Sequence, residues 1–209
     1  MMKSSLLFLC AGILSAQPFS VGVKGGVPLT SDLGGYYPTS ESRRYTVGPM
    51  VTAGLPLGFR LEFAALYRRV GFRTVYNDIL GDSFAERDRG NSWEFPIVVR
   101  RAVWHGVYAG IGYAPRAING SGQVNSISLT SINPVIKTYS ERTLPGSWST
   151  THGVVGAVGI EKRWGPLHIA PEVRYTRWNR PAVNVNGSHG FTIQSTQNQV
   201  DLLVGIRFP

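Results

Sequence analysis

The chain has 209 residues, of which 16% are charged, and its formal net charge is +9. This length is enough for one domain with a sizeable core. The basic residues are spread along the sequence instead of forming a patch, and no nucleic-acid-binding motif accompanies them. The composition therefore argues against a nucleic-acid partner.

The N-terminus has the pattern of a secretory signal peptide. Lys3 precedes the apolar run LLFLCAGIL, which is followed by the small residues Ser15 and Ala16. The run is too short for a membrane-spanning helix. We expect residues 1–17 to be the signal and residues 18–209 to be the mature domain. The only cysteine lies inside the run, so the exported chain is expected to form no disulfide.

Beyond the signal, apolar residues recur at every second position, which is the period of a β-strand with one apolar face. Eight such runs follow in chain order, at residues 19–27, 47–55, 59–67, 93–99, 107–113, 154–160, 169–175 and 200–208. No amphipathic helix of useful length competes with them. The pattern predicts an all-β fold, an eight-stranded antiparallel up-and-down transmembrane β-barrel.

The connections between these runs alternate between short and long. The short ones, which contain Gly or Pro and predict tight turns, are residues 56–58, 102–106 and 162–166. The long ones are residues near 31–45, 74–91, 118–150 and 179–198. An up-and-down strand order collects the short turns at one end and the long loops at the other. Outer-membrane barrels have this asymmetry, with short periplasmic turns and long external loops.

Two of the long segments alternate as well. Residues 182–193 contain an Asn-Gly turn and predict a hairpin that extends the seventh and eighth strands. Residues 124–139 alternate around an Asn-Pro turn. They predict a second external hairpin or, alternatively, two more wall strands in a ten-stranded barrel.

Four prolines conflict with a continuous hydrogen-bond ladder. They lie within or near predicted strands, and they are Pro49, Pro96, Pro115 and Pro171. Proline donates no backbone hydrogen bond, and a closed barrel has no free edge to accommodate it. Each proline is therefore expected to coincide with a bulge or with the end of a strand.

Charged residues gather on the face opposite the apolar one. They are Lys24, Arg60, Arg68, Arg100, Arg174 and Arg207, with Glu62, Glu94, Glu161, Glu172 and Asp201. Their signs nearly balance, as a narrow lumen requires, because a buried ion is costly unless it is paired. We predict that they form an ion-pair network inside the barrel, with the apolar face turned to lipid. A soluble, lipocalin-like carrier with the charges outside is the alternative.

Aromatic residues cluster near the ends of the predicted strands. Those expected near the external ends are Tyr67, Trp93, Tyr113 and Tyr175, and those expected on the turn side are Phe19, Phe59, Trp104, Trp164 and Phe208. Aromatic residues that merely favoured strands would be scattered along each run. Two aromatic belts are typical of a barrel that spans a membrane.

Four segments of the chain resemble a known protein family. WEFPIVVRR, GVYAGIGYAPR, GVVGAVGIEKRWGPLHIAPEVRYTRW and the ending VDLLVGIRF resemble the bacterial outer-membrane protein β-barrel domain family, with its small PorT-like and OmpX/OmpA-like barrels. The resemblance implies a last strand that ends in an aromatic residue read by the outer-membrane assembly machinery. Phe208 fits this role, although Pro209 follows it, a departure from the family pattern.

The chemistry-bearing residues point to no catalytic centre. His105 and His168 are expected to be turn or interface residues. His152 and His189 lie near hydroxyl residues in external segments, where a base beside a hydroxyl would suit a lipid-A-modifying enzyme. The spacing matches no pattern of that kind, and neither metal-ligand spacing nor a cofactor motif is present. We therefore expect no catalytic residue, no metal and no cofactor.

The sequence favours a small monomeric barrel of the outer membrane with a structural, adhesion or surface-interaction role. Its expected partners are outer-membrane lipids and lipopolysaccharide, whose phosphates would meet basic residues at the external rim, and the assembly machinery. Those residues are Arg43, Arg44, Arg69, Arg73, Arg177 and Arg180. A narrow passive channel or transport component and a lipid-A-modifying enzyme remain alternatives.

Overall fold

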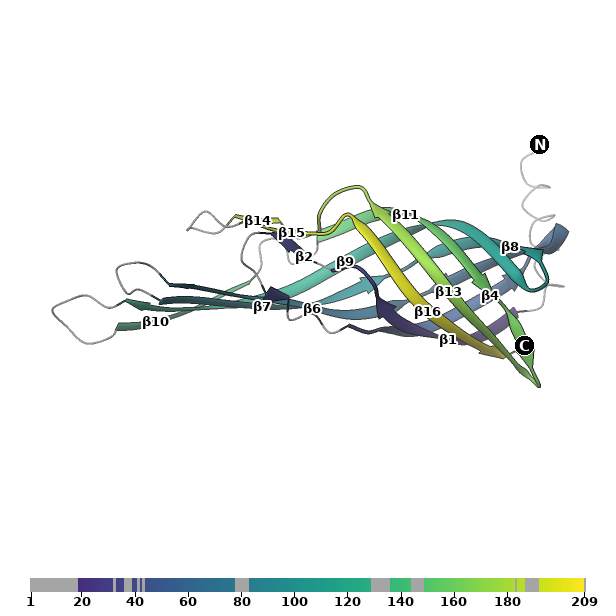
Figure 1. Ribbon diagram of the computed structural model, residues 1–209, viewed down its shortest axis with the longest axis horizontal. Coiled ribbons are helices and arrows are strands. Elements are labelled where there is room, and N and C mark those ends of the chain that lie inside the picture. The colour runs from purple at the N-terminus through teal and green to yellow at the C-terminus, as the bar shows by residue number, and fades with distance from the viewer. Residues whose placement is uncertain are drawn as a thin grey trace, which may run out of the picture.

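The computed structural model describes residues 19–31, 33–35, 39–40, 42, 44–77, 83–128, 136–143, 149–182, 184–186 and 192–208. The expected signal peptide, residues 1–17, lies outside this set. Almost all described residues belong to β-strands, which form a tilted barrel with an extension at one end (Figure 1). The one helical element in the described part of the chain is the 3₁₀ turn η1 (Pro56–Gly58). No helix there has the length and hydropathy to span a bilayer.

Eight antiparallel strands form the barrel wall, and each pairs with its neighbours in the sequence. Two of them are interrupted once and carry two labels. In chain order the wall strands are β1 (Phe19–Pro28), β4 (Thr46–Gly54), β5 (Phe59–Ala64) continued by β6 (Leu66–Asn77), β7 (Ser83–Glu94) continued by β8 (Ile97–Trp104), β9 (Val107–Ser128), β11 (Ser149–Ile160), β13 (Leu167–Trp178) and β16 (Asn198–Phe208). The last strand, β16, pairs with β1 and closes the barrel. The predicted eight-stranded up-and-down architecture is confirmed.

Tight turns join the wall strands at one end of the barrel, which we call the turn end. There η1 joins β4 to β5, and His105 and Gly106 join β8 to β9. Gly165 follows β12 (Lys162–Trp164), a short strand that pairs with the start of β13. Gly106 and Gly165 have φ values of 86° and 60°, a region that favours glycine. The opposite end is called the loop end.

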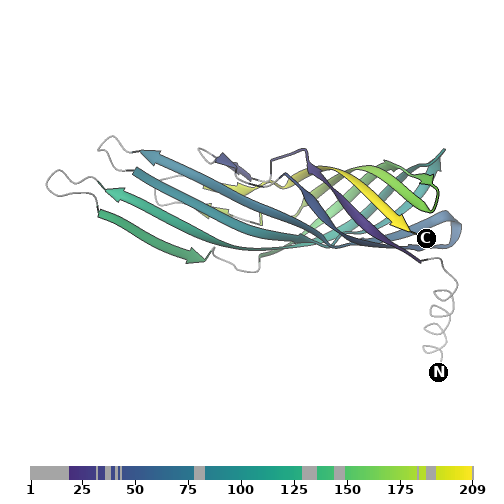
Figure 2. The same cartoon turned by 90° about the horizontal axis from the view of Figure 1, so that it is seen from below.

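At the loop end, β6, β7 and β9 continue past the barrel wall (Figure 2). β11 pairs with β9 only as far as Ile118, and β9 then continues between β7 on one side and β10 (Ile136–Thr143) on the other. Together with β6, these strands form what we call the protruding sheet. Parts of the segments 74–91 and 118–150, expected to be loops, are therefore strands. Their residues are mostly polar in both phases, so the apolar alternation that marks the wall strands is weak there.

The other strands at the loop end are short. Asn184–Asn186 (β14), Thr192–Ser195 (β15) and Leu33–Gly35 (β2) form a separate three-stranded sheet, and Thr39–Ser40 (β3) pairs with β6. The hairpin predicted within 182–193 thus pairs with β2 instead of lengthening the wall. Among the described residues, β10 pairs with β9 alone. Residues 124–128 and 136–139 are therefore paired with each other beyond the wall, and the ten-stranded alternative is wrong.

The two faces of the wall are oriented as the sequence predicts. Phe63 and Val173 are 44% and 48% exposed on the outer surface. Glu62, Glu94 and Arg174 are buried in the lumen. The alternation that distributes them is the period-two geometry of a strand, and it places the apolar face outside. A lipocalin-like arrangement with a greasy interior is excluded.

The prolines interrupt hydrogen bonds without changing the strand register. β4 pairs with β5 at Met50↔Ala64 and with β6 at Val47↔Tyr67, so the register is the same on both sides of Pro49. The carbonyl of Pro49 still accepts a hydrogen bond from the amide of Ala65, at 3.0 Å. The expectation of a bulge or strand end is therefore wrong here. Because proline has no backbone N–H, the wall lacks one hydrogen-bond donor here, but the strands keep their register.

Pro96 and Pro115 lie on adjacent strands at a similar level of the wall. Pro96 falls in the break between β7 and β8, and its carbonyl accepts from the amide of Ala64 at 3.1 Å. The carbonyl of Pro115 accepts from Phe95 at 2.9 Å. Pro171 stays within β13, opposite Val204. We expected each of the four prolines to lie at a bulge or a strand end, and Pro96 alone lies at a strand end.

Replacing Val204 by arginine should destabilise the barrel, because the side chain points outward from the middle of β16. An arginine at the bilayer midplane costs about 2–4 kcal/mol. The free energy of unfolding in lipid vesicles, measured by urea titration, should fall by that amount. Val103→Arg, an outward position at the turn end, serves as the control and should cost about 0–1 kcal/mol. Equal losses of unfolding free energy in the two variants would contradict a position of Val204 near the bilayer midplane.

Candidate functional site

The centre of the lumen holds four ions from three strands, which we call the central layer. Lys24 of β1 forms ion pairs with Glu62 of β5 and with Glu172 of β13, the latter at 3.0 Å. Arg174 contacts the same two carboxylates at 2.9 and 2.7 Å. The Tyr108 hydroxyl donates to Glu172 at 2.8 Å. Two cations and two anions thus neutralise one another across the full width of the barrel.

A second group lies nearer the loop end, and we call it the loop-end layer. Arg68 binds Asp201 at 2.7 Å and lies 3.9 Å from Glu94. The Gln199 amide donates to Asp201 at 2.7 Å and to Glu94 at 3.3 Å. Arg116 stands opposite Glu94 in the ladder between β7 and β9. This layer also contains two cations and two anions.

The third group, the turn-end layer, surrounds one carboxylate. Arg60 donates to both oxygens of Glu161, at 2.6 and 2.7 Å. Arg100 lies 3.6 Å from Glu161, and Arg207 also pairs with it. His168 places Nδ1 3.0 Å from the same carboxylate. Three guanidinium groups therefore surround one acidic side chain, and one of them, Arg100, also lies 3.2 Å from Glu62 of the central layer.

All eleven residues expected in an ion-pair network lie in these three layers. Sequence reasoning missed Arg116, whose guanidinium lies 4.0 Å above the Trp178 ring. It also missed Gln199, which accepts a hydrogen bond from the Trp178 indole at 3.0 Å. Both Arg116 and Trp178 share the inward phase of their strands, so continuing the alternation past Pro115 and Tyr175 would have found them.

The position of Tyr108 depends on a glycine in the neighbouring strand. A Cβ atom added to Gly159 would come within 2.5 Å of the Tyr108 hydroxyl oxygen. Glycine therefore leaves room for the tyrosine to reach the Glu172 carboxylate. In a lumen this narrow, the volume of each inward side chain decides which polar contacts its neighbours can make.

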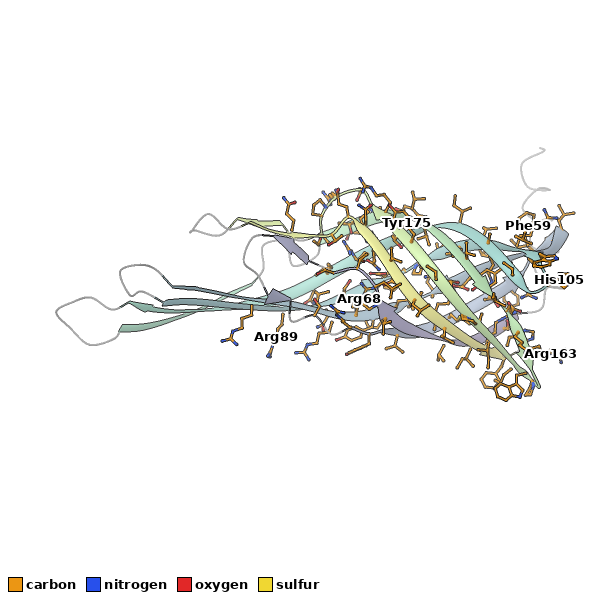
Figure 3. The ribbon with its side chains drawn as sticks, in the orientation of Figure 1. Phe59, Arg68, Arg89, His105, Arg163 and Tyr175 are labelled. Atoms are coloured by element: carbon orange, nitrogen blue, oxygen red, sulfur yellow. The ribbon has the colours of Figure 1, made fainter. Side chains whose placement is uncertain are left out.

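The predicted belt residues lie on the outer surface at two levels. In Figure 3, Phe59 lies at the turn end of the barrel, and Tyr175 lies nearer the protruding strands. Trp164 is the most exposed member of the turn-end set, at 76%. At the other level, the Tyr67 and Trp93 rings lie 5.2 Å apart. The Tyr175 hydroxyl donates to Asn198 at 2.8 Å, so its polar tip has a protein partner while its ring faces outward.

His105 occupies the tight turn between β8 and β9, as expected, whereas the other described histidines lie in wall strands. His168 faces the lumen and contacts Glu161, which corrects its assignment to a turn or interface. His152 lies on the outer surface, stacked on the Tyr113 ring at 5.6 Å, and shares a hydrogen bond with its hydroxyl. The neighbouring Thr151 is buried and accepts from Arg116 at 3.3 Å. His189 lies outside the described residues.

No family model matches the chain, and no curated protein matches it. Three solved structures with similar folds are Ail of Yersinia pestis (TM-score 0.38, 8% identity, 92% of this chain and 97% of that chain), Neisserial surface protein A (0.38, 12%, 92% and 98%) and the outer-membrane protease OmpT of Escherichia coli (0.40, 11%, 91% and 93%). At these scores the likenesses carry no inference about what the protein does.

Removing Arg174 should destabilise the barrel strongly, because Glu172 would keep Lys24 alone as a cationic partner among the described residues. Breaking a buried pair by removing one partner costs about 3–5 kcal/mol. The free energy of unfolding of Arg174→Met, followed by tryptophan fluorescence in urea, should fall accordingly. Arg163→Met, which removes an exposed arginine at the turn end, should change it by less than about 0.5 kcal/mol. A similar loss of unfolding free energy in both variants would show that the ion pairs of the central layer contribute no more to stability than an exposed arginine does.

Proposed function

We propose that the protein is an integral outer-membrane barrel whose lumen is a closed structural core. Lipid leaves backbone groups without water, and a closed sheet satisfies them internally. The outward apolar face and the aromatic residues at two levels suit acyl chains and the interfaces. In this orientation the turn end faces the periplasm and the protruding sheet faces the exterior.

We further propose that the protruding sheet carries a surface-interaction or adhesion role. The observation behind this proposal is that β9 runs for 22 residues and leaves the wall after Ile118. Its last part is held by backbone pairing with β7 and β10, so the external segment is an ordered sheet. Among the described residues the outer edge of β10 pairs with no other strand. Such an edge can accept an extended segment of another protein as an added strand.

Basic residues at the external rim support contact with lipopolysaccharide phosphates. Arg44, Arg73 and Arg177 are exposed at this end of the wall. Arg180 is also exposed, and it donates to the Thr150 carbonyl at 2.9 Å. Arg43 lies outside the described residues. Guanidinium groups bind phosphate through paired hydrogen bonds, so this rim would anchor the barrel in the outer leaflet.

The last strand supports the proposed recognition by the assembly machinery. Phe208 ends β16 and is 54% exposed on the outer surface, opposite Val21 of β1. Its side chain therefore lies on the outer surface at the turn end, where it would be read by the assembly machinery. We expect the assembled protein to act as a monomer, because β1 and β16 pair with each other and leave no open wall edge.

Deleting the tip of the protruding sheet should abolish adhesion without preventing barrel assembly. In cells that display the protein, we expect replacement of residues 121–143 by Asn-Gly to reduce adherence to polystyrene to the level of cells with an empty vector. The matched control removes residues 185–193 from the small external sheet and should retain adherence. Assembly of each variant is checked by the shift in gel mobility on boiling. Undiminished adherence of the first variant would overturn the adhesion role.

The purified protein should give no steady conductance in planar lipid bilayers. The central layer joins β1, β5 and β13 across the lumen, and displacing it would expose unpaired buried ions. Current is recorded beside a general porin in the same bilayer system. A stable open level above the lipid background would favour the passive-channel alternative over a closed core.

A further inference from the structure

The turn-end layer carries an unbalanced positive charge inside the barrel. The central and loop-end layers each contain two cations and two anions, whereas this layer has three guanidinium groups around Glu161. Lys24 and Arg68 have carboxylates of their own in the other layers. Arg100 also lies 3.2 Å from Glu62 of the central layer, so the two excess positive charges lie in the turn-end layer and at its boundary with the central layer.

A cavity opens at the same place. Its volume is about 640 Å³, and it is lined by Arg60, Arg100, Glu161 and Tyr108, with the β4–β5 turn and Phe59 along its rim. Cavities of this size hold small organic molecules. The wall combines cationic groups with an aromatic and aliphatic surface, so it suits a ligand that has both an anionic group and a small organic part.

Arg100 supplies the donors that such a ligand would use. Its side chain is 3% exposed, and it lies 3.2 Å from Glu62 and 3.6 Å from Glu161. However, none of its three nitrogen atoms makes a hydrogen bond with the described residues. A guanidinium carries five N–H donors, and leaving buried donors unsatisfied is costly. The Arg100 Cζ atom lies over the Tyr108 ring, 4.8 Å from its centroid.

We propose that this cavity binds a phosphate group, either as inorganic phosphate or as a small phosphate monoester. Arg100 donates from the inner wall, and Arg60, whose side chain is 42% exposed, donates from the mouth. Two negative charges on the ligand offset the two unbalanced cations. The Glu161 carboxylate keeps Arg60 and Arg207 aligned while limiting how strongly the site attracts anions. This binding activity goes beyond the proposed adhesion role and does not depend on it.

The test is a calorimetric titration of the folded full-length barrel in uncharged detergent at low ionic strength. The probes are inorganic phosphate, glycerol 3-phosphate and, as the uncharged comparison, glycerol. We expect saturable binding of both phosphates and none of glycerol. Tighter binding of glycerol 3-phosphate would identify the organic monoester as the ligand, and equal affinities would identify the phosphate group alone. Absence of saturable binding of either phosphate overturns the proposal.

Variants with opposite expected effects on phosphate affinity distinguish binding in the cavity from attraction by the net charge of the protein. Arg60→Gln should weaken phosphate binding about tenfold, the value of one charge-assisted hydrogen bond. Glu161→Gln should strengthen it, because an internal competitor for the arginines is removed. Arg101→Gln is the matched control: it removes the adjacent arginine, which faces outward over Phe59.

The Arg101 variant should bind phosphate within about twofold of the unchanged protein, less than the value of one hydrogen bond. Folding of every variant is checked by gel mobility before and after boiling. Because Arg60 is partly exposed, its replacement is compatible with folding even if Glu161→Gln does not assemble. Equal weakening by Arg60→Gln and Arg101→Gln would show that net charge, and not the cavity, attracts the anion.

Discussion

The structure depends on the narrowness of a closed eight-stranded wall. Every second residue of each strand must point into a space with room for side chains and little water. A charge in such a space is tolerated only beside an opposite charge, so Lys24, Glu62 and Arg174 cannot be considered separately. The hydrogen-bond ladder fixes the alternation, the alternation fixes the lumen, and the lumen demands complementary ions. The apolar outer face follows from the same alternation.

Strand period was enough to predict the wall and its inward charges. The alternation of His168 to Arg177 places Glu172 and Arg174 on one face and Val173 on the other, and the structure has the same arrangement. What the pattern could not provide is the distance between groups on different strands. Arg60 and Glu161 are separated by 101 positions, and only the closed barrel brings them together. The grouping of charges into three layers is a property of register, which composition does not reveal.

The regions beyond the wall were harder to predict for a different reason. The ends of β7 and β9 carry no apolar phase, since no lipid and no core selects for one face. Pro115 also appeared to end its strand, although the ladder continues past it and positions Arg116 in the lumen. A proline that keeps its carbonyl contact removes a donor but does not stop a strand whose neighbours hold the register. The polar sequence of these strands therefore prevented prediction of the protruding sheet, and Pro115 prevented prediction of Arg116 in the lumen.

The ions of the central layer also bear on how the chain assembles. Lys24 stands in the first strand, and its partner Glu172 is 148 positions later, in the seventh. These groups must stay hydrated until both strands have arrived, and they lose their water only as the cylinder shuts. An incomplete sheet inserted in lipid would expose bare ammonium and carboxylate groups to hydrocarbon. Partial insertion is thereby penalised, which makes the last step of membrane entry cooperative and couples it to the joining of the two terminal strands.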